Sequence, residues 1–516
     1  MQKNLILFII LSGITIFVWH FFIAPQQEKE IYHNHLENQS SVTQQLMVKN
    51  AQLNNSVFDN QHKEEHINIE NEHYKAILTN KGAAILSWSI KEKNGHFVDL
   101  VLQDTSSYVM ANFPDLIYKI ISKSKNKIVF EYISKEGWKI TKTYNLSNLY
   151  MHNLNITVEK PCEVNIPQID IKWGPGIGSD IIETKENIAI TRALAYTAKK
   201  PSKLKKLKNI SEPASLYKWT AIDNRYFLVA FIPEKSMDFY KISSSKLDKK
   251  HPCFINISTA IPKGISKKQY SVNFYLGPKA YTYLKTYNLG LEKTVDFGIF
   301  GFLGKITFVI LTFFYRLTHN YGWTIVIITI IVQILVLPLT LKSLKSAAAM
   351  KRIQPIIKDI QIKYKNSPQR LQVEMLNVYR SQKVNPLGGC LPMLLQLPIF
   401  WAFFTMLRNT YELRNEGWIL WIKDLSMADH FIQIGTFNVN LLPLIMGIGM
   451  FLQQKMTAVT SDPMQKRMIY LMPVIFTIMF WGFPSGLVIY WITNSIVSMI
   501  EQYFIIKKDS IRVKHF

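Results

Sequence analysis

The strongest constraint on this chain is a series of long apolar segments in its C-terminal part, which begins at Trp323. Segments of this length and composition are typical of helices that cross a lipid bilayer. A few uncharged polar residues interrupt them: Thr329, Gln333, Gln396, Tyr490 and Asn494. Because polar groups are costly in hydrocarbon, these side chains are expected to face protein or a water-filled cavity. A polar interior without a buried acid or base suits the handling of polar cargo better than the pumping of ions.

The composition agrees with a membrane protein. The chain has 516 residues, 48% hydrophobic content and a formal net charge of +24, and its length favours two or three domains. A basic excess indicates nucleic acid, anionic lipid or simple solubility, and the apolar segments favour the membrane. A run of six lysines between Lys199 and Lys208 is interpreted as a solvated loop. Cys162 and Cys253 could pair in an oxidising compartment, but two cysteines make no disulfide framework.

The N-terminal region predicts a membrane anchor followed by a linker. The apolar run from Leu5 to Ile23 is long enough to cross a bilayer as a helix. A cleaved signal peptide would have a shorter apolar region and a small-residue cleavage site, where this chain has Trp19 and Phe21. Residues 1–24 are therefore predicted to be an uncleaved transmembrane anchor. Residues 25–71 are rich in Gln, Asn, Glu and His and are predicted to be a flexible linker.

Residues 72–294 are predicted to form an all-β sandwich domain. Apolar and polar residues alternate with a period of two in segments such as 127–132 and 138–144, which is typical of half-buried strands. Many such segments between turn residues predict a sandwich. Residues 295–319 are apolar but contain Lys305 and Arg316. We expect an amphipathic helix in the membrane interface there, with a further span as the alternative.

Residues 320–506 are predicted to be a helical membrane core, with spans at 323–341, 391–407, 441–453, 468–481 and 486–506. The spans at 441–453 and 468–481 are short, which fits either a re-entrant pair or helices in a thinned bilayer. Residues 342–384 are strongly basic, with apolar residues at helical spacing, and Ser367-Pro368 is a typical helix start. They are predicted to form a two-helix hairpin whose basic residues include Lys351, Arg352, Lys358 and Lys363.

Charge near the span ends predicts the orientation. The hairpin and the tail over 507–516 are basic, whereas the loop over 408–440 is balanced, so hairpin and tail are expected in the cytoplasm. With the anchor, six spans then place both termini inside. The β-domain lies outside, in a periplasm-like space, and its lysines do not contradict this because large domains are translocated regardless of charge.

Ordered motifs in the core carry a resemblance to a known family. They are Asn385–Cys390, Pro392–Phe400, Asp462–Gln465, Met472–Phe476 and Phe483–Leu487. Together they closely resemble the YidC/Oxa family of membrane protein insertases, from about Trp323 to Ile506. The order of anchor, β-domain and core resembles the Gram-negative form of the family, which implies the bacterial inner membrane and a periplasmic β-domain.

The resemblance implies a mechanism without nucleotide hydrolysis or a cofactor. In the family, core helices enclose a hydrophilic groove that is open to the cytoplasm and to lipid and closed on the outer side. A polar cargo segment enters the groove while its apolar segment slides into lipid along the third and fifth spans. The implied partners are nascent membrane proteins and the Sec translocon with its accessory subunits. The basic hairpin could also meet a ribosome, a targeting particle or anionic lipids, or serve topology alone.

The residues of this chain fit such a groove. Thr329, Gln333 and Thr340 share one helical face, and Tyr490, Asn494 and Ser498 share another. The predicted groove residues are Thr329, Gln333, Thr340, Gln396, Tyr490, Trp491 and Asn494, and the predicted slide residues are Met393, Leu397, Pro398, Phe400, Met472 and Phe476. Ordinary interhelical polar contacts, worth about 0.6 kcal/mol each, are the alternative.

Two positions depart from the family pattern. Gln333 stands where the family usually has an arginine, so the groove is expected to keep hydrogen bonding but to lose a fixed charge. Trp491 stands where the second tyrosine of a pair is expected, which puts a tyrosine-specific role in doubt. Two other functions compete. A secondary transporter would need ionisable groups in the membrane and often a repeat. An envelope sugar-binding protein would use the β-domain, but fold alone does not give function.

Overall fold

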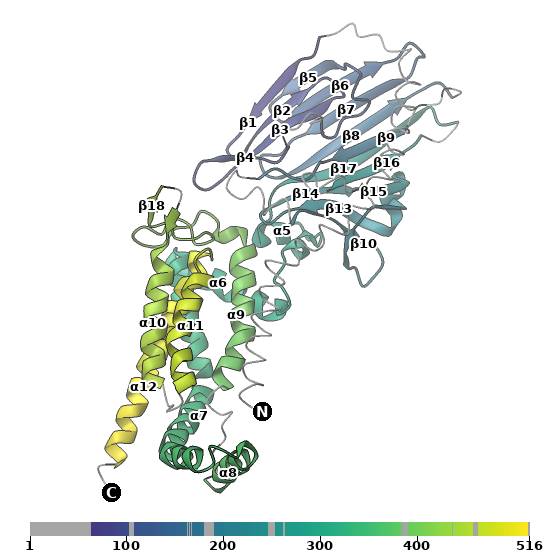
Figure 1. The fold of residues 1–516 in the computed structure, drawn as a ribbon. Helices are drawn as coiled ribbons and strands as arrows, with labels where there is room; N and C mark the ends of the chain where they lie inside the picture. Colours follow the sequence, from purple (N-terminus) through teal and green to yellow (C-terminus); the bar gives the residue numbers. More distant parts are fainter. Residues whose placement is uncertain are drawn as a thin grey trace. The chain divides into compact units, whose positions relative to one another are not determined.

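The computed structural model describes residues 63–102, 108–162, 164, 166, 168–179, 190–245, 253–261, 264–382, 384, 391–435, 437–457 and 463–513. A region of antiparallel sheets comes first along the chain, and a bundle of helices follows (Figure 1). The predicted anchor over 1–24 and the predicted linker up to residue 62 lie outside the described residues.

The strands of the first region are β1 His66–Glu70, β2 Tyr74–Thr79, β3 Ala84–Lys91, β4 Phe97–Asp99, β5 Lys119–Ser124, β6 Lys127–Ile133, β7 Lys139–Asn145, β8 Met151–Glu159, β9 Ile169–Trp173, β10 Arg192–Thr197, β11 Leu204–Leu207, β12 Ile210–Glu212, β13 Tyr217–Asp223, β14 Phe227–Pro233, β15 Lys241–Ser245, β16 Phe254–Thr259 and β17 Lys267–Pro278. They form sheets in the orders β1-β2-β3-β4, β11-β10-β13-β14-β17-β8-β7-β6-β5 and β12-β15-β16-β9. The strands predicted at 127–132 and 138–144 are confirmed as β6 and β7.

Alternating burial explains why these segments are strands. In β8, buried and half-buried residues alternate along all nine positions, so one face enters the core. Strand β14 is buried at every position, which fits a central strand with both faces covered. Trp88 of β3 packs against His152 of β8 and Phe274 of β17, with ring centroids 4.8 and 6.5 Å away. The β1–β4 sheet therefore packs on the nine-stranded sheet.

Two predictions about this region, its first residue and its all-β content, are wrong. Strand β1 begins at His66, inside the predicted linker 25–71, because its backbone pairs with β2 from His66–Thr79 to Glu70–Lys75. Pairing with another strand satisfies backbone groups whatever the local composition. The region is also not entirely β, since the helix α5 Tyr281–Thr286 and the 3-10 helix η5 Leu291–Thr294 follow β17.

A buried histidine makes the stability of the β-region depend on pH. Burial lowers the pKa of His152 from 6.5 to about 3, and the Ser147 N–H donates to its Nδ1 at 3.1 Å. The folded state keeps His152 neutral, whereas the unfolded chain binds a proton below pH 6.5. Stability contributed by neutral His152 is therefore present above pH 6.5 and lost as pH falls toward about 3, by up to about 1.4 kcal/mol per pH unit.

We predict that His152→Asn, which keeps an acceptor but cannot titrate, flattens this dependence. The check is thermal unfolding of the full-length protein in detergent, between about pH 7 and about pH 5. The wild type should lose clearly more stability than the variant over that interval. Equal losses would mean that other groups control acid unfolding.

The helical region comprises α6 Gly301–Thr318, α7 Tyr321–Lys363, α8 Pro368–Ser381, α9 Leu391–Asn409, α10 Leu441–Thr457, α11 Pro463–Met479 and α12 Ser485–Val513. A 3-10 turn, η6 Tyr411–Leu413, and a hairpin of β18 Ile432–Ile434 and β19 Phe437–Val439 lie between α9 and α10. Among the described residues, Gly301–Thr318 and Tyr321–Ser343 are long and apolar enough to cross a membrane, and Leu441–Met456 and Tyr470–Met479 are shorter apolar helices.

Two helices are longer than predicted. Helix α7 runs without a break from Tyr321 to Lys363, so the predicted span at 323–341 continues into the first helix of the predicted hairpin 342–384. Pro338 and Pro355 lie inside this helix, where a proline removes one backbone hydrogen bond but does not always end the helix. Helix α12 continues to Val513, into the predicted tail over 507–516. Helix α8 begins at Pro368, as the Ser-Pro pattern predicts.

Contacts place successive helix ends alternately at the two ends of the bundle. The segment between α9 and α10 meets the start of α7, where the rings of Trp323 and Trp418 lie 5.4 Å apart. It also meets the start of α12, where the Ser485 hydroxyl donates to the Met427 carbonyl at 2.6 Å. At the same end, the Asn440 amide before α10 donates to the carbonyl of Trp481 after α11 at 2.5 Å. Figure 1 shows β18 at this end of the bundle and α8 at the opposite end.

Candidate polar groove and outer docking site

Three predicted groove residues meet between α9 and α12. The Gln396 amide Nε2 lies 2.5 Å from the Tyr490 hydroxyl and 3.5 Å from the side-chain Oδ1 of Asn494. Tyr490 is fully buried, and its ring stacks on Phe403 of α9 at 4.6 Å. Residues 490 and 494 are one helical turn apart, so one glutamine on α9 can reach both. The structure therefore joins Gln396 of the predicted span 391–407 to Tyr490 and Asn494 of the predicted span 486–506.

The predicted groove residues of α7 differ in their hydrogen bonding. The Thr329 hydroxyl bonds to the Ile325 carbonyl at 2.7 Å and that of Thr340 to the Val336 carbonyl at 3.3 Å, so both bond within their own helix. Gln333 is 4% exposed, and within the described part of the chain its amide has no hydrogen-bond partner. A buried amide without a protein partner is free to bind water or a polar guest. Gln333 is therefore the α7 residue best suited to a wet groove.

Trp491 does not belong to the hydrogen-bonded group of Gln396, Tyr490 and Asn494. Its ring contacts Phe400 of α9 at 5.3 Å, Phe476 of α11 at 5.7 Å and Phe480 at 5.4 Å. It thus joins two of the predicted slide residues in an apolar aromatic cluster. Leu397 is exposed beside them, and Pro398 and Met472 are half-buried. Met393 lies in α9, but its side chain is outside the described residues.

The structure adds polar residues that the sequence analysis missed. Buried side-chain oxygens without a hydrogen-bond partner in the described chain occur on Gln454 of α10 and on Ser495, Glu501 and Gln502 of α12. Helices α10 and α12 pack against each other. Glu501 corrects the prediction of a polar interior without an acid, since it lies within the predicted span 486–506. Asn494, Ser498 and Gln502 follow one another at four-residue spacing, a signal that would have located Gln502.

The basic hairpin has a small core of its own. Ile353 and Ile357 of α7 and Val384 are buried together, and Met375, Val378 and Tyr379 of α8 pack against them. Arg352, Lys358 and Lys363 are exposed on this hairpin. Lys351 belongs to the same helix, but its side chain lies outside the described residues. The hairpin therefore presents basic side chains to solvent at the end of the bundle opposite β18.

An ion pair joins the β-region to the segment after α9. The Arg414 Nε lies 2.5 Å from Glu92 Oε1, and the Asn415 amide donates to Glu92 Oε2 at 2.8 Å. The Arg414 and Glu92 side chains are only 4% and 2% exposed. The Arg414 guanidinium also lies over the Tyr226 ring, 4.6 Å from its centroid. These contacts define what we call the outer docking site: Glu92, Tyr226, Arg414 and Asn415.

Glu412 belongs to the same segment and bonds to α5. Its Oε1 accepts from the Thr282 N–H at 3.2 Å and from the Thr282 hydroxyl at 3.0 Å. Burial raises the pKa of the Glu412 carboxyl, and the Thr282 hydrogen bonds and nearby Lys93 oppose that rise. The segment after α9 is thus held by the turn that follows β3, by the turn before β14 and by α5.

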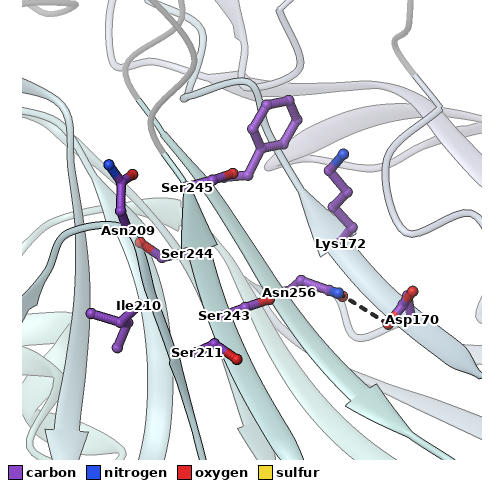
Figure 2. A pocket seen from close by; sticks show the side chains of 10 residues that line it. Asp170, Lys172, Asn209, Ile210, Ser211, Ser243, Ser244, Ser245 and Asn256 are labelled. Atoms are coloured by element: carbon purple, nitrogen blue, oxygen red, sulfur yellow. Dashed lines mark hydrogen bonds between the residues drawn. The ribbon is translucent and has the colours of Figure 1, made fainter. Parts of the chain in front are cut away.

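The β-region also has a polar hollow on the face of its β12-β15-β16-β9 sheet, with a volume of about 610 Å³ (Figure 2). Ser211, Ser243, Asn256 and Lys172 form one cross-strand row there, and Asn256 donates to Asp170 at 3.0 Å. The described residues contain no group of three His, Cys, Asp or Glu side chains that could hold a metal. Cys162 is exposed and Cys253 buried, and the two do not form a disulfide with each other.

Family models match both regions of this chain. A family model described as "YidC periplasmic domain" matches residues 114–310, and one described as "60Kd inner membrane protein" matches residues 313–512. A crystal structure of an active YidC insertase with its first transmembrane domain resolved is 20% identical, with a TM-score of 0.39, over 86% of this chain and 93% of that one.

Curated relatives extend over the whole chain. The membrane protein insertase YidC of Syntrophus aciditrophicus is 34% identical over 87% of this chain and 86% of its own length. That of Endomicrobium trichonymphae is 70% identical over 519 aligned residues, covering 100% of both chains. With matches of this identity and coverage, the chain belongs to the YidC family of membrane protein insertases.

Proposed function

We propose that this insertase receives a polar segment of its cargo in a groove between α7, α9, α10 and α12, while the apolar segment leaves along α9 and α11. The observation that carries the proposal is a set of buried side-chain oxygens without a hydrogen-bond partner in the described chain, on Gln454 of α10 and on Ser495, Glu501 and Gln502 of α12. Gln333 of α7, which is 4% exposed, adds an amide to this set. Burying a polar group without a hydrogen bond costs about 1–3 kcal/mol. Water or a polar cargo segment in the groove would remove that cost.

The exit path follows the aromatic cluster. Phe400 of α9, Phe476 of α11 and Trp491 of α12 present apolar surface between the two helices, with Leu397 exposed beside them. An apolar cargo helix packed there exchanges protein contacts for lipid contacts at little cost, since neither environment offers hydrogen bonds. The predicted slide residues Met393, Pro398 and Met472 are part of the same proposal.

In the membrane, we place the end of the bundle near β18 outside and the hairpin in the cytoplasm. Helices α7, α9, α10, α11 and α12 then alternate in direction across the inner membrane, and the predicted anchor is the sixth span. Both termini lie inside and the β-sandwich domain lies in the periplasm. The basic residues of the hairpin support this orientation.

Helix α6 belongs to the outer interface in this arrangement. Phe308, near the middle of α6, contacts the Tyr281 ring of α5 at 5.2 Å. If α6 crossed the bilayer, its middle would lie at the centre of the hydrocarbon and would carry α5 there with it. Unpaired polar backbone of the β-region is excluded from that depth. An interfacial helix keeps the contact and leaves its apolar face in lipid.

Partners beyond the cargo follow from charge and from the family. The exposed Arg352, Lys358 and Lys363 are suited to a ribosome, a targeting particle or anionic lipids, and the Sec translocon with its accessory subunits is a further partner. Replacing the three residues by glutamine tests the first set. Unchanged insertion with unchanged topology would leave these residues a topological role only.

A replacement experiment tests the function. A Gram-negative cell is depleted of its own insertase, this chain is expressed, and protease accessibility of the outer loop of a short, Sec-independent membrane protein is followed. The loop should become accessible from the periplasm. A folded, membrane-integrated chain that leaves the loop inside would overturn independent insertion and confine the protein to assisting the translocon.

The uncharged side chain of Gln333 leads to a prediction about substrate preference. Without a fixed positive charge, the groove should distinguish acidic from neutral leading loops only weakly. We predict that Gln333→Arg raises insertion of a cargo with an acidic loop relative to one with a neutral loop, by roughly threefold to tenfold, which corresponds to about 1 kcal/mol of attraction. Gln333→Lys should act in the same direction and Gln333→Asn should not. An unchanged ratio in all three variants would contradict the idea.

A further inference from the structure

The nine-stranded sheet carries a cluster of unpaired lysines at one edge. We call residues 199–208 the lysine hairpin, since they include most of the turn between β10 and β11 and the whole of the edge strand β11. Five of its lysines are exposed and have no ion pair within the described residues: Lys199, Lys200, Lys203, Lys206 and Lys208. Only Lys205 is paired, with Glu212 at 2.7 Å. The hairpin is ordered, because the Lys203 N–H donates to the Thr197 hydroxyl at 2.8 Å.

Direct contacts tie this edge of the sheet to the segment that enters α6. Arg192 of β10 donates to the Thr294 carbonyl at 3.2 Å and lies 3.5 Å from Asp296. The Lys293 ammonium donates to the Tyr196 hydroxyl at 2.6 Å. The Trp219 indole of neighbouring β13 donates to the Leu289 carbonyl at 2.9 Å. Strand β11 lies next to β10, so its lysines are about one strand spacing, roughly 5 Å, from that contact.

Helix α6 presents an apolar stripe to its surroundings. Phe302, Ile306, Val309, Phe313 and Leu317 are all exposed and follow one another at helical spacing. Such a stripe enters the boundary between headgroups and acyl chains. The sheet edge that carries the lysine hairpin is therefore the edge bonded to a membrane-contacting helix. The opposite edge, β5, lies eight strand spacings away, or about 38 Å.

We propose that the lysine hairpin binds anionic phospholipid headgroups of the leaflet in which α6 lies, and so holds the β10 edge of the sheet against the membrane. The proposal rests on the interfacial placement of α6 proposed above, but not on insertion activity. Lysine ammonium groups are compact point charges on flexible stems, which suits scattered phosphates better than a shaped partner. The hairpin exposes no large hydrophobic side chain, whereas protein interfaces are anchored by such residues.

Electrostatics sets the expected size of the effect. Each lysine near an anionic surface shifts the ratio of membrane-bound to unbound hairpins by about fivefold. The attraction falls off within a Debye length, about 8 Å at physiological ionic strength. Binding should therefore require anionic lipid, weaken with salt and depend on lysines at this edge of the sheet rather than on net charge.

The experiment uses the full-length chain, with its three cysteines replaced by alanine and Ser202→Cys carrying a fluorophore. The protein is reconstituted into bilayers of phosphatidylcholine, with or without phosphatidylglycerol, that contain a lipid with a nitroxide on its headgroup. Quenching of the fluorophore reports contact of the hairpin with headgroups. A fluorophore at Ser124→Cys, on the β5 edge, is the control label.

Two charge-matched variants separate location from net charge. One changes Lys200, Lys203, Lys206 and Lys208 to glutamine, and the other changes Lys119, Lys123, Lys125 and Lys127, which are exposed near the β5 edge. We expect strong quenching at position 202 only with phosphatidylglycerol, loss of it in the first variant and in high salt, and no change in the second variant. Position 124 should stay unquenched throughout.

Several outcomes would overturn the proposal. These are equal quenching at position 202 in both bilayers, equal losses in both variants, or quenching that appears only after an acidic protein is added. If the first variant does not fold, the proposal is still tested by the salt dependence of quenching at position 202 in the labelled protein that keeps all its lysines. The replacement experiment is scored separately, so an inactive chain with a bound hairpin would count against the insertase mechanism and not against lipid binding.

Discussion

Arg414→Ala is expected to lower the free energy of unfolding of this protein by about 3–5 kcal/mol. The substitution leaves the Glu92 carboxylate buried, with the Asn415 amide as its remaining hydrogen-bond donor in the docking site. A buried charge that loses its counter-ion keeps its full desolvation cost. The substitution also removes the guanidinium from the Tyr226 ring, a cation–π contact worth about 0.5–2 kcal/mol.

A neighbouring ion pair provides the matched control. Lys93 follows Glu92 directly and pairs with Glu416 at 2.6 Å, but these two side chains are 41% and 21% exposed. Lys93→Ala should therefore cost less than about 1 kcal/mol. The double substitution Glu92→Leu with Arg414→Leu should recover most of the loss, because it leaves neither charge alone.

The measurement is thermal unfolding of the full-length protein in detergent, followed by tryptophan fluorescence. If Arg414→Ala were no more destabilising than Lys93→Ala, the docking site would contribute nothing beyond a surface contact. If the double substitution were as damaging as the single one, the pair itself would be required. Since the Arg414 segment directly follows α9, which carries Gln396, the expected loss would also loosen the outer end of a groove helix.

Local sequence patterns predicted most elements of this fold but not their limits. The strands β6 and β7 were predictable because apolar and polar residues alternate with a period of two in 127–132 and 138–144. Strand β1 was not, because it lies in a polar stretch and is stabilised by pairing with β2. Helix α7 was predicted as a span followed by a separate helix, since Pro338 and the change from apolar to basic residues suggested an end. The change of environment does not interrupt its backbone hydrogen bonding.

The groove was predictable only one helix at a time. Helical spacing grouped Tyr490 with Asn494, but the link to Gln396 is a tertiary contact between residues 94 positions apart. Trp491 was included because it stands where the family pattern has the second tyrosine of a pair, although neighbours in a helix point about 100° apart and so face different sides. The docking site lay beyond sequence reasoning altogether, because Glu92 and Arg414 are 322 positions apart and neither belongs to a motif.

Gln333→Leu combined with Asn494→Leu is expected to slow insertion of a cargo with a polar outer loop by at least tenfold. Each substitution removes an amide that water or the cargo could bond, worth about 0.5–1.5 kcal/mol. Together they amount to about 1–3 kcal/mol, a range that includes the roughly 1.4 kcal/mol that corresponds to a factor of ten. The double variant would also dry the groove, so that the loop would meet hydrocarbon, where each unsatisfied group costs several kcal/mol.

The same chemical change outside the groove is the control. Gln361 lies in the hairpin half of α7 and is half-buried, so Gln361→Leu removes an amide from the same helix without altering the predicted groove. The measurement is the rate at which the outer loop of the cargo becomes accessible to protease. It is made for one cargo with a long polar loop and for a second with a very short loop.

The ratio of the insertion rates of the two cargoes distinguishes a groove from ordinary packing between helices. If Gln333 and Asn494 only join helices, their removal should cost about 0.6 kcal/mol of stability each and slow both cargoes alike. If they solvate a translocating loop, the long polar loop should be slowed at least tenfold more than the short one. Thermal unfolding of the single variant Gln333→Leu separates the two effects, because Gln333 has no hydrogen-bond partner within the described chain and so no interhelical hydrogen bond to lose, whereas Asn494 accepts from Gln396.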